Sequence, residues 1–281
     1  MIRLASVIET FEADLRAQYR AQLTPEHTRA LAAIKDLLMR ASWETVRTFS
    51  QNDKQLHGMP GAIAVLHTNT RRLDYHPHVH LVMPAAAIDT EHGLWRKKHG
   101  YLFRHKALAK VFRAKLLAAI KASGLTLPSR YPEQWVVDCK SVGSGEKALV
   151  YLGRYLYRGV IREQDIVACG DGQVVFRYRC AKSGKFERRA MTGAAFLWLV
   201  LQHVLPKGFR RARNFGFLHP NCKRLIALLQ LVLKFAPVQA WVKPRPPIVC
   251  PCCGAVMAIV KTRIRTQFDG PLPVPRAAEG V

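Results

Sequence analysis

The sequence predicts an α+β fold, in which amphipathic helices and antiparallel hairpins follow one another along the chain. Two kinds of pattern lead to this class. Apolar side chains recur at helical spacing in several segments, whereas residues 64–83 and 173–192 alternate in the manner of two-stranded hairpins. With 281 residues, the chain is long enough to bury a real core, as one large domain or as one domain with appendages.

The charge balance indicates the kind of partner. Lys and Arg number 44 and Asp and Glu 19, so the formal net charge is +25. Such an excess favours a polyanionic partner, of which nucleic acid is the commonest. A membrane surface is the weaker alternative, because the basic residues are spread over many elements and not massed on one amphipathic helix. A membrane-spanning segment is not expected, because no apolar run is long enough to cross a bilayer. Seven cysteines without a regular framework favour a reducing cytoplasm, and no secretory signal is visible at the N-terminus.

The first 50 residues predict a helical segment. Apolar residues at helical spacing indicate one helix over residues 6–23. Thr24 followed by Pro25 is the pattern of an N-cap and first helical position, and the second helix is expected to run to about Phe49. Residues 57–61, rich in Gly and Pro, are expected to break the chain before the first hairpin.

The first hairpin carries a candidate metal site. Side chains alternate along a strand, so His78 and His80 lie on one face. The polar segment 69–74 is the predicted turn, and folding there brings His67 opposite that pair. Three imidazoles on one face can hold one metal ion. The alternative is a set of ordinary strand histidines, and His76, which precedes a proline, is assigned no role.

A helix farther along the chain carries the candidate nucleophiles. Residues 84–100 predict loop and short strand, 105–122 a helix, 133–142 a strand, and 146–158 a further helix. Within this last helix, Tyr151 and Tyr155 are four residues apart and therefore lie one turn apart on the same face. Tyr157 points elsewhere. The alternative is a pair of core or rim tyrosines with satisfied hydroxyls.

Two basic segments are candidates for contact with DNA. The hairpin 173–192 can lie along a phosphate backbone, although a solvated face is the alternative, and a core helix is expected after Thr192. Residues 206–217 mix basic and aromatic residues, a composition suited to single strands. The candidate nucleic-acid-binding residues are Arg177, Arg179, Lys182, Lys185, Arg188, Arg189, Arg210, Arg211 and Arg213.

The C-terminal part predicts an apolar helix over 222–236, a Pro-rich linker over 244–247 and a disordered tail from about Phe268. Between linker and tail lies half of a possible Zn²⁺ site, formed by Cys250, Cys252 and Cys253. The expected organisation is therefore an N-terminal helical segment (1–50), a core (51–220) and a C-terminal part (221–281).

In combination, the motif His78-Val79-His80, the Tyr151 and Tyr155 helix and the segment 203–209 resemble the two-tyrosine HUH transposases of rolling-circle insertion sequences, the insertion-sequence ninety-one group. The resemblance runs from Ile2 to about Met257. It implies an HUH-endonuclease-like central antiparallel sheet that carries the histidines, flanked by helices, one of which presents the tyrosines. It also implies a DNA transposase that nicks and rejoins single-stranded DNA at element ends and target.

The same resemblance implies the chemistry. Mg²⁺ or Mn²⁺ held by His67, His78 and His80 would activate the phosphate, and tyrosine attack would leave a 5′-phosphotyrosine and a free 3′-hydroxyl. Members of the group usually insert a Cys-rich zinc ribbon before the position of Leu37. In this chain Leu37 follows Asp36 directly, so the insert is absent. Two alternatives stay open: an inactive DNA-binding remnant, and a plasmid replication initiator or relaxase with the same chemistry.

Overall fold

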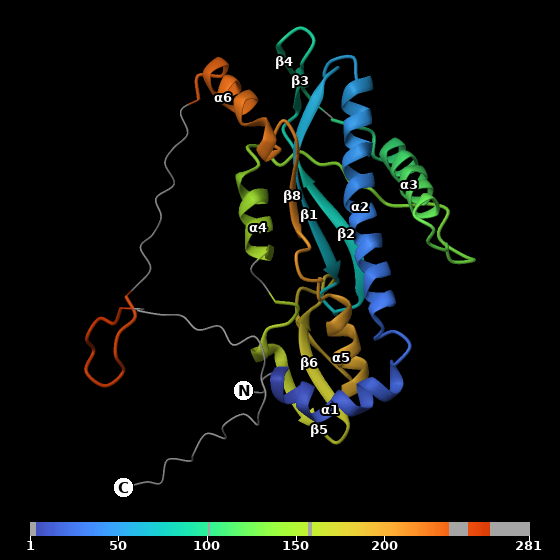
Figure 1. Ribbon diagram of the computed structural model, residues 1–281, viewed down its shortest axis with the longest axis vertical. Coiled ribbons are helices and arrows are strands. Elements are labelled where there is room, and N and C mark those ends of the chain that lie inside the picture. Colours follow the sequence, from blue (N-terminus) through green and yellow to red (C-terminus); the bar gives the residue numbers. More distant parts are fainter. Residues whose placement is uncertain (1–3, 101, 157–158, 236–246, 259–281) are drawn as a thin grey trace. The chain divides into compact units, whose positions relative to one another are not determined.

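The computed structural model describes residues 4–100, 102–156, 159–235 and 247–258, and the chain divides into two compact units, Met1–Phe235 and Ala236–Val281. The predicted α+β class is confirmed, because antiparallel sheets are flanked by helices (Figure 1). The helices are α1 (Leu4–Gln18), α2 (Pro25–Asn52), α3 (His105–Ala122), α4 (Glu146–Leu156), α5 (Gly193–Gln202) and α6 (Lys223–Val232). The strands are β1 (Met59–Asn69), β2 (Tyr75–Val82), β3 (Ala86–Asp89), β4 (Leu94–Lys97), β5 (Ile166–Gly170), β6 (Gln173–Arg179), β7 (Phe186–Thr192) and β8 (Ala212–Gly216).

The first sheet is built around β1. Its strand order is β2-β1-β3-β4, and β8 also pairs with β1, along residues 61–65. The predicted chain break at 57–61 is confirmed at His57 and Gly58 but ends earlier than predicted, because β1 already begins at Met59. Gly61 of β1 lies against the ring of Phe217, and a Cβ at this position would come within 2.7 Å of that ring. The missing side chain lets the segment after β8 pack closely against the strand.

The two faces of this sheet have different roles. Ala64 and Leu66 of β1 and Val79 and Leu81 of β2 pack against apolar residues of α2 and α3 such as Met39. Because side chains alternate along a strand, the histidines project from the opposite face. Figure 1 shows α4 on the side of the sheet away from α2 and α3. The packing of one face therefore leaves the other free to carry polar groups.

Helix α2 supports the apolar face through its middle part, which includes Leu38, Met39 and Ala41. It begins as predicted, with the Thr24 side chain accepting a hydrogen bond from the His27 backbone N–H at 3.2 Å and Pro25 in the first turn. It then runs without interruption through Asp36 and Leu37. The place at which the resembling transposases carry a zinc ribbon is thus an ordinary turn of helix.

The second sheet, β5-β6-β7, packs against α1 and α5. The hairpin over 173–192 and the core helix after Thr192 are confirmed, and β5 is an additional strand that the sequence did not predict. Gly193 allows α1 to lie close to α5, since a Cβ at that position would come within 2.1 Å of the Phe11 ring. Phe11, Phe176 and Phe196 are among the buried residues of this core.

The turn between β1 and β2 joins the two sheets. Leu73 adopts φ 68°, is 3% exposed, and belongs to the core of the second sheet. Its carbonyl accepts a hydrogen bond from His203 Nε2 at 2.8 Å. Arg189 of β7 donates to the Arg72 carbonyl at 2.8 Å and forms an ion pair with Asp74 at 2.6 Å. The end of the histidine hairpin is therefore fixed to the second sheet.

The predicted strand over 133–142 is wrong. This segment lies fully within the described residues and forms no strand, although it alternates between partly buried and exposed side chains. Trp135 packs edge-on against Phe112 of α3, with ring centres 5.6 Å apart, while Val136 is 93% exposed. The alternation arises from an extended segment lying on a helix and not from pairing with another strand.

Other boundaries also differ from the prediction. Helix α1 ends at Gln18 and not at Leu23, and α6 ends at Val232. Residues 84–100 contain the β3–β4 hairpin, and the basic segment 206–217 supplies β8. The predicted tail, and all but the last residue of the predicted linker, lie outside the described residues.

Candidate metal centre and adjoining cleft

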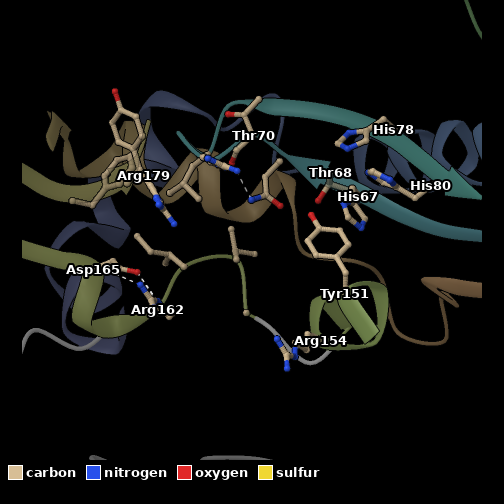
Figure 2. A pocket seen from close by; sticks show the side chains of 18 of the residues that line it. His67, Thr68, Thr70, His78, His80, Tyr151, Arg154, Arg162, Asp165 and Arg179 are labelled. Atoms are coloured by element: carbon tan, nitrogen blue, oxygen red, sulfur yellow. Dashed lines mark hydrogen bonds and ion pairs between the residues drawn. The ribbon is translucent and has the colours of Figure 1, made fainter. Parts of the chain in front are cut away.

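Three histidines converge on the open face of the first sheet. His67 of β1 lies directly opposite His78 of β2, and His80 follows on the same face. Potential ligand nitrogens of the three rings lie within 4.8 Å of one another. Ring centres are 4.2 Å apart for His67 and His80 and 5.3 Å for His67 and His78. Figure 2 shows the three rings gathered beside the two strands, as the sequence predicted.

The surroundings keep these imidazoles neutral. Burial lowers the pKa of His67 to about 3, with further lowering by the neighbouring His80 and His78. Burial also lowers the pKa values of His78 and His80. The neutral imidazole is the form that binds a metal, so no proton need be displaced from this cluster at neutral pH.

A backbone contact sets the tautomer of one ring. His78 Nδ1 lies 2.7 Å from the carbonyl oxygen of His76, which can only accept, so Nδ1 carries the proton and Nε2 presents its lone pair. His76 therefore contributes through its backbone. Three neutral nitrogen donors from two rigid strands suit a divalent metal that keeps further positions open for substrate.

Tyr151 of α4 faces this cluster. Its ring centre lies 6.3 Å from that of His67 and 6.5 Å from that of His80, and the residue is 55% exposed. In Figure 2 its ring lies beside His67. Tyr155 lies one turn farther along α4, but its side chain, like Tyr157 as a whole, lies outside the described part of the chain.

The loop before α4 sets the position of this helix. Gly145 has φ 79°, a left-handed conformation that glycine adopts without strain, and a Cβ there would lie 3.9 Å from Val82 of β2. Leu152 is 4% exposed and so holds the helix by its apolar side. The neighbouring Tyr151 consequently projects toward the histidines.

A cleft of about 1170 Å³ extends from the histidines to the second sheet. Figure 2 shows His80 and Tyr151 toward one end and Arg179 toward the other. Among the described residues that line it, positive side chains outnumber the carboxylates, Glu146 and Asp165. The basic residues of the lining are Arg71, Lys147, Arg154, Arg162, Arg177, Arg179 and Arg211. The cleft is therefore suited to a polyanion that reaches the histidines.

The predicted nucleic-acid-binding residues do not all lie here. Arg177, Arg179 and Arg211 line the cleft. Arg188 is exposed beside Arg177, because the two are opposite each other in the β6–β7 register. Arg189 points from the other face of the hairpin and is held by the β1–β2 turn.

The remaining candidates lie elsewhere. Arg213 forms an ion pair with Asp36 of α2 at 2.5 Å, so it helps to attach β8 to that helix. Arg210 is exposed beyond the cleft, as are Lys182 and Lys185 in the hairpin turn. Arg71 and Arg154 line the cleft but were not predicted. Arg154 follows Tyr151 by three residues, and this helical spacing was the available signal.

The cysteine segment forms a small turn in the second unit. Val249 bridges to Val256, and the Cys250 N–H donates to the Ala255 carbonyl at 2.8 Å. Backbone N–H groups of Cys252 and Cys253 lower the pKa of the Cys250 thiol. Within the described residues, however, these cysteines do not form a group of three potential ligands of the kind that the histidines form. Separately, no described helix has the length and apolar character needed to cross a membrane.

Comparison with known proteins gives the class. The model of the family described as "Putative transposase" matches residues 61–225, a span that contains the three histidines and α4. The chain belongs to this family. Two curated relatives are similar to it, and no solved structure matches.

One relative is "Putative transposase y4qJ" of Sinorhizobium fredii, which is 32% identical over 213 residues, covering 66% of this chain and 53% of the relative. The other is "Transposase for insertion sequence element IS801" of Pseudomonas savastanoi pv. phaseolicola, which is 29% identical over 232 residues, covering 70% of this chain and 55% of the relative. The chain thus spans about half the length of the curated relatives it matches.

Proposed function

We propose that this chain is a DNA transposase of the two-tyrosine HUH, rolling-circle type, which nicks and rejoins single-stranded DNA through a 5′-phosphotyrosine intermediate. The observation that carries the proposal is the Tyr151 ring, 6.3 Å from His67 and open to a basic cleft. Residues 51–220 are the nuclease core, between a helical segment (1–50) and a C-terminal part (221–281). Both curated relatives are described as transposases, which supports the assignment.

The described side chains account for the chemistry. A divalent cation, Mg²⁺ or Mn²⁺, bound to His67, His78 and His80 would polarise the scissile phosphate and offset its developing charge. The Tyr151 hydroxyl, whose ordinary pKa is ~10, needs such help to act near neutral pH. Its oxygen forms a bond to phosphorus as the bond to the 3′-oxygen breaks, so a free 3′-hydroxyl remains. Reversal by another 3′-hydroxyl joins strands, and Tyr155 would provide a second acceptor.

The basic lining holds the strand for this reaction. Arg154 lies on α4 beside Tyr151, and Arg211 lies near the histidines, so both can contact phosphates that flank the reacting one. Contacts of this kind position DNA without reading its sequence. The proposed substrates are accordingly single strands at the element ends and at the target.

Covalent capture tests the nucleophile. Wild-type protein, Mn²⁺ and a single-stranded oligonucleotide bearing an element end should give a protein–DNA adduct that survives denaturing electrophoresis. Tyr151→Phe and Tyr155→Phe should each impair complete strand transfer, and the double variant should form no adduct. Tyr131→Phe is the matched control, since Tyr131 lies under Arg113 and away from the cleft. An adduct that persists in the double variant would refute the assignment.

Metal titration tests the histidines separately. Changing His78 and His80 together to Ala should abolish Mn²⁺ binding in calorimetry and also abolish adduct formation. His76→Ala is the matched control, because His76 lies on the same strand and contributes its backbone carbonyl, which this substitution retains. Unchanged Mn²⁺ affinity in the double variant would remove the metal centre from the mechanism.

A further inference from the structure

The exposed face of the β6–β7 hairpin presents an aromatic ring among arginines. Phe186 is 61% exposed. It is opposite Arg179 in the antiparallel register, and Arg177 is opposite Arg188, so all four side chains share one face. The Arg177 guanidinium lies 5.3 Å from the centre of the Phe186 ring. An apolar ring of this size is left in water with only part of its surface covered.

The charged side chains that β6 and β7 contribute to this face are all positive. Glu187 is the only carboxylate within β6 and β7, and it lies on the opposite face, where it accepts a hydrogen bond from the Tyr178 hydroxyl at 2.7 Å. Two contacts orient the arginines beside the ring. Arg177 donates Nε to Asp165 at 2.9 Å, and Arg179 donates Nε to the Gly184 carbonyl at 2.9 Å.

The aromatic face is continuous with the candidate metal centre. Phe186, Arg177 and Arg179 line the same cleft as His67 and Tyr151. A DNA strand whose phosphate lies at the histidines can therefore continue along the cleft to this face. An aromatic ring between phosphate-binding groups is the arrangement by which proteins hold unpaired bases, since every base offers a flat surface for stacking.

We propose that Phe186 is a stacking platform for one unpaired base of the DNA strand, with Arg177 and Arg179 contacting the phosphates on either side. The inference rests on the proposed function in taking single-stranded DNA as the ligand. A base in duplex DNA is already stacked between its neighbours, so it cannot lie on the ring without being extruded. The platform would thus select unpaired DNA at a distance from the reacting phosphate.

Binding to an oligodeoxythymidine tests the platform without the chemistry. Fluorescence anisotropy of the full chain, in chelator and at several salt concentrations, should show Phe186→Ala weakening affinity roughly 5- to 150-fold, the range expected for loss of one stacked base. The salt dependence should keep its slope, because no phosphate contact is lost, whereas Arg179→Ala should reduce it by roughly 0.7. Phe186→Trp should retain affinity.

Phe235→Ala is the matched control, because Phe235 is also exposed, at 59%, and does not line the cleft. Affinity of Phe186→Ala within twofold of wild type would overturn the proposal, as would an equal loss in Phe235→Ala or an equal loss on duplex DNA. Photocrosslinking of the wild-type chain to an iododeoxyuridine oligonucleotide avoids any folding defect of a variant. The crosslinked peptide should contain Phe186, and crosslinks confined to other segments would contradict the platform.

The two proposals can fail separately. Should wild-type protein form no covalent adduct while Phe186→Ala still loses affinity for the oligonucleotide, the platform stands and the transposase chemistry fails. Should wild-type protein form the adduct while Phe186→Ala binds normally, the chemistry stands and the platform fails.

Discussion

Acid should destabilise this protein through the buried histidine His67. Burial lowers its pKa in the folded chain from 6.5 to about 3, whereas the unfolded chain regains the ordinary value. The unfolded state therefore binds more protons between these two pH values, and the free energy of unfolding rises with pH in that window. The contribution of His67 is fully present above pH 6.5 and is lost progressively as the pH falls toward about 3.

The size of the effect follows from proton binding to the unfolded state. At about pH 5.5 an imidazole of ordinary pKa gains roughly 1.4 kcal/mol from protonation, and at about pH 7.5 it gains almost none. Folded His67 gains nothing at either pH, since it is 3% exposed and stays neutral. His67 should thus cost about 1.4 kcal/mol of stability over this interval. Lowered pKa values of His78 and His80 add losses of the same sign.

Urea denaturation of the metal-free chain at the two pH values measures this loss. The pH-dependent difference in unfolding free energy should be smaller in His67→Gln than in wild type by about 1.4 kcal/mol, whatever the absolute stability of the variant. His99→Gln provides a control, because His99 is exposed on the surface. An unchanged pH dependence in His67→Gln would refute the inference that His67 is neutral and buried in the folded state.

Four further outcomes are expected. Gly216→Ala should destabilise the protein by at least about 2 kcal/mol in urea denaturation, because Gly216 has φ 60° and a Cβ there would lie 1.8 Å from the Pro60 carbonyl oxygen. Gly170→Ala, with open space around its Cβ position, should cost far less. Arg188→Ala should flatten the salt dependence of DNA binding by roughly 0.7, with little effect on stability. Arg189→Ala should instead lower stability, because its guanidinium holds the β1–β2 turn.

The histidine cluster was largely predictable because strand geometry is local. A strand places alternate residues on one face, so His78 and His80 had to lie together if residues 75–82 formed a strand. The short polar turn then fixed the pairing partner, and His67 does lie opposite His78. The orientation of Tyr151 follows less directly, because it depends on where the loop at Gly145 places α4.

Long-range pairing was not predictable by the same reasoning. The segment 206–217 has a composition typical of nucleic-acid contact, yet residues 212–216 pair with β1, and Arg213 is partnered by Asp36. No local sequence pattern shows that the edge of β1 opposite β2 is open to pairing with a distant strand such as β8. At 133–142 a strand was predicted where none forms. The alternating burial of this segment comes from packing on α3 and not from pairing in a sheet.

The turn at Leu73 explains how residues far apart in sequence form one cleft. Its side chain lies in the core of the second sheet, while the strands on either side of it carry His67 and His78. Leu73 adopts a left-handed conformation, an unfavourable one for a leucine, and burial of its side chain together with the hydrogen bond from His203 offsets this cost. The same turn is held from the second sheet by Arg189, a neighbour of Arg188. The histidines and the basic hairpin are therefore positioned relative to each other by one anchored turn.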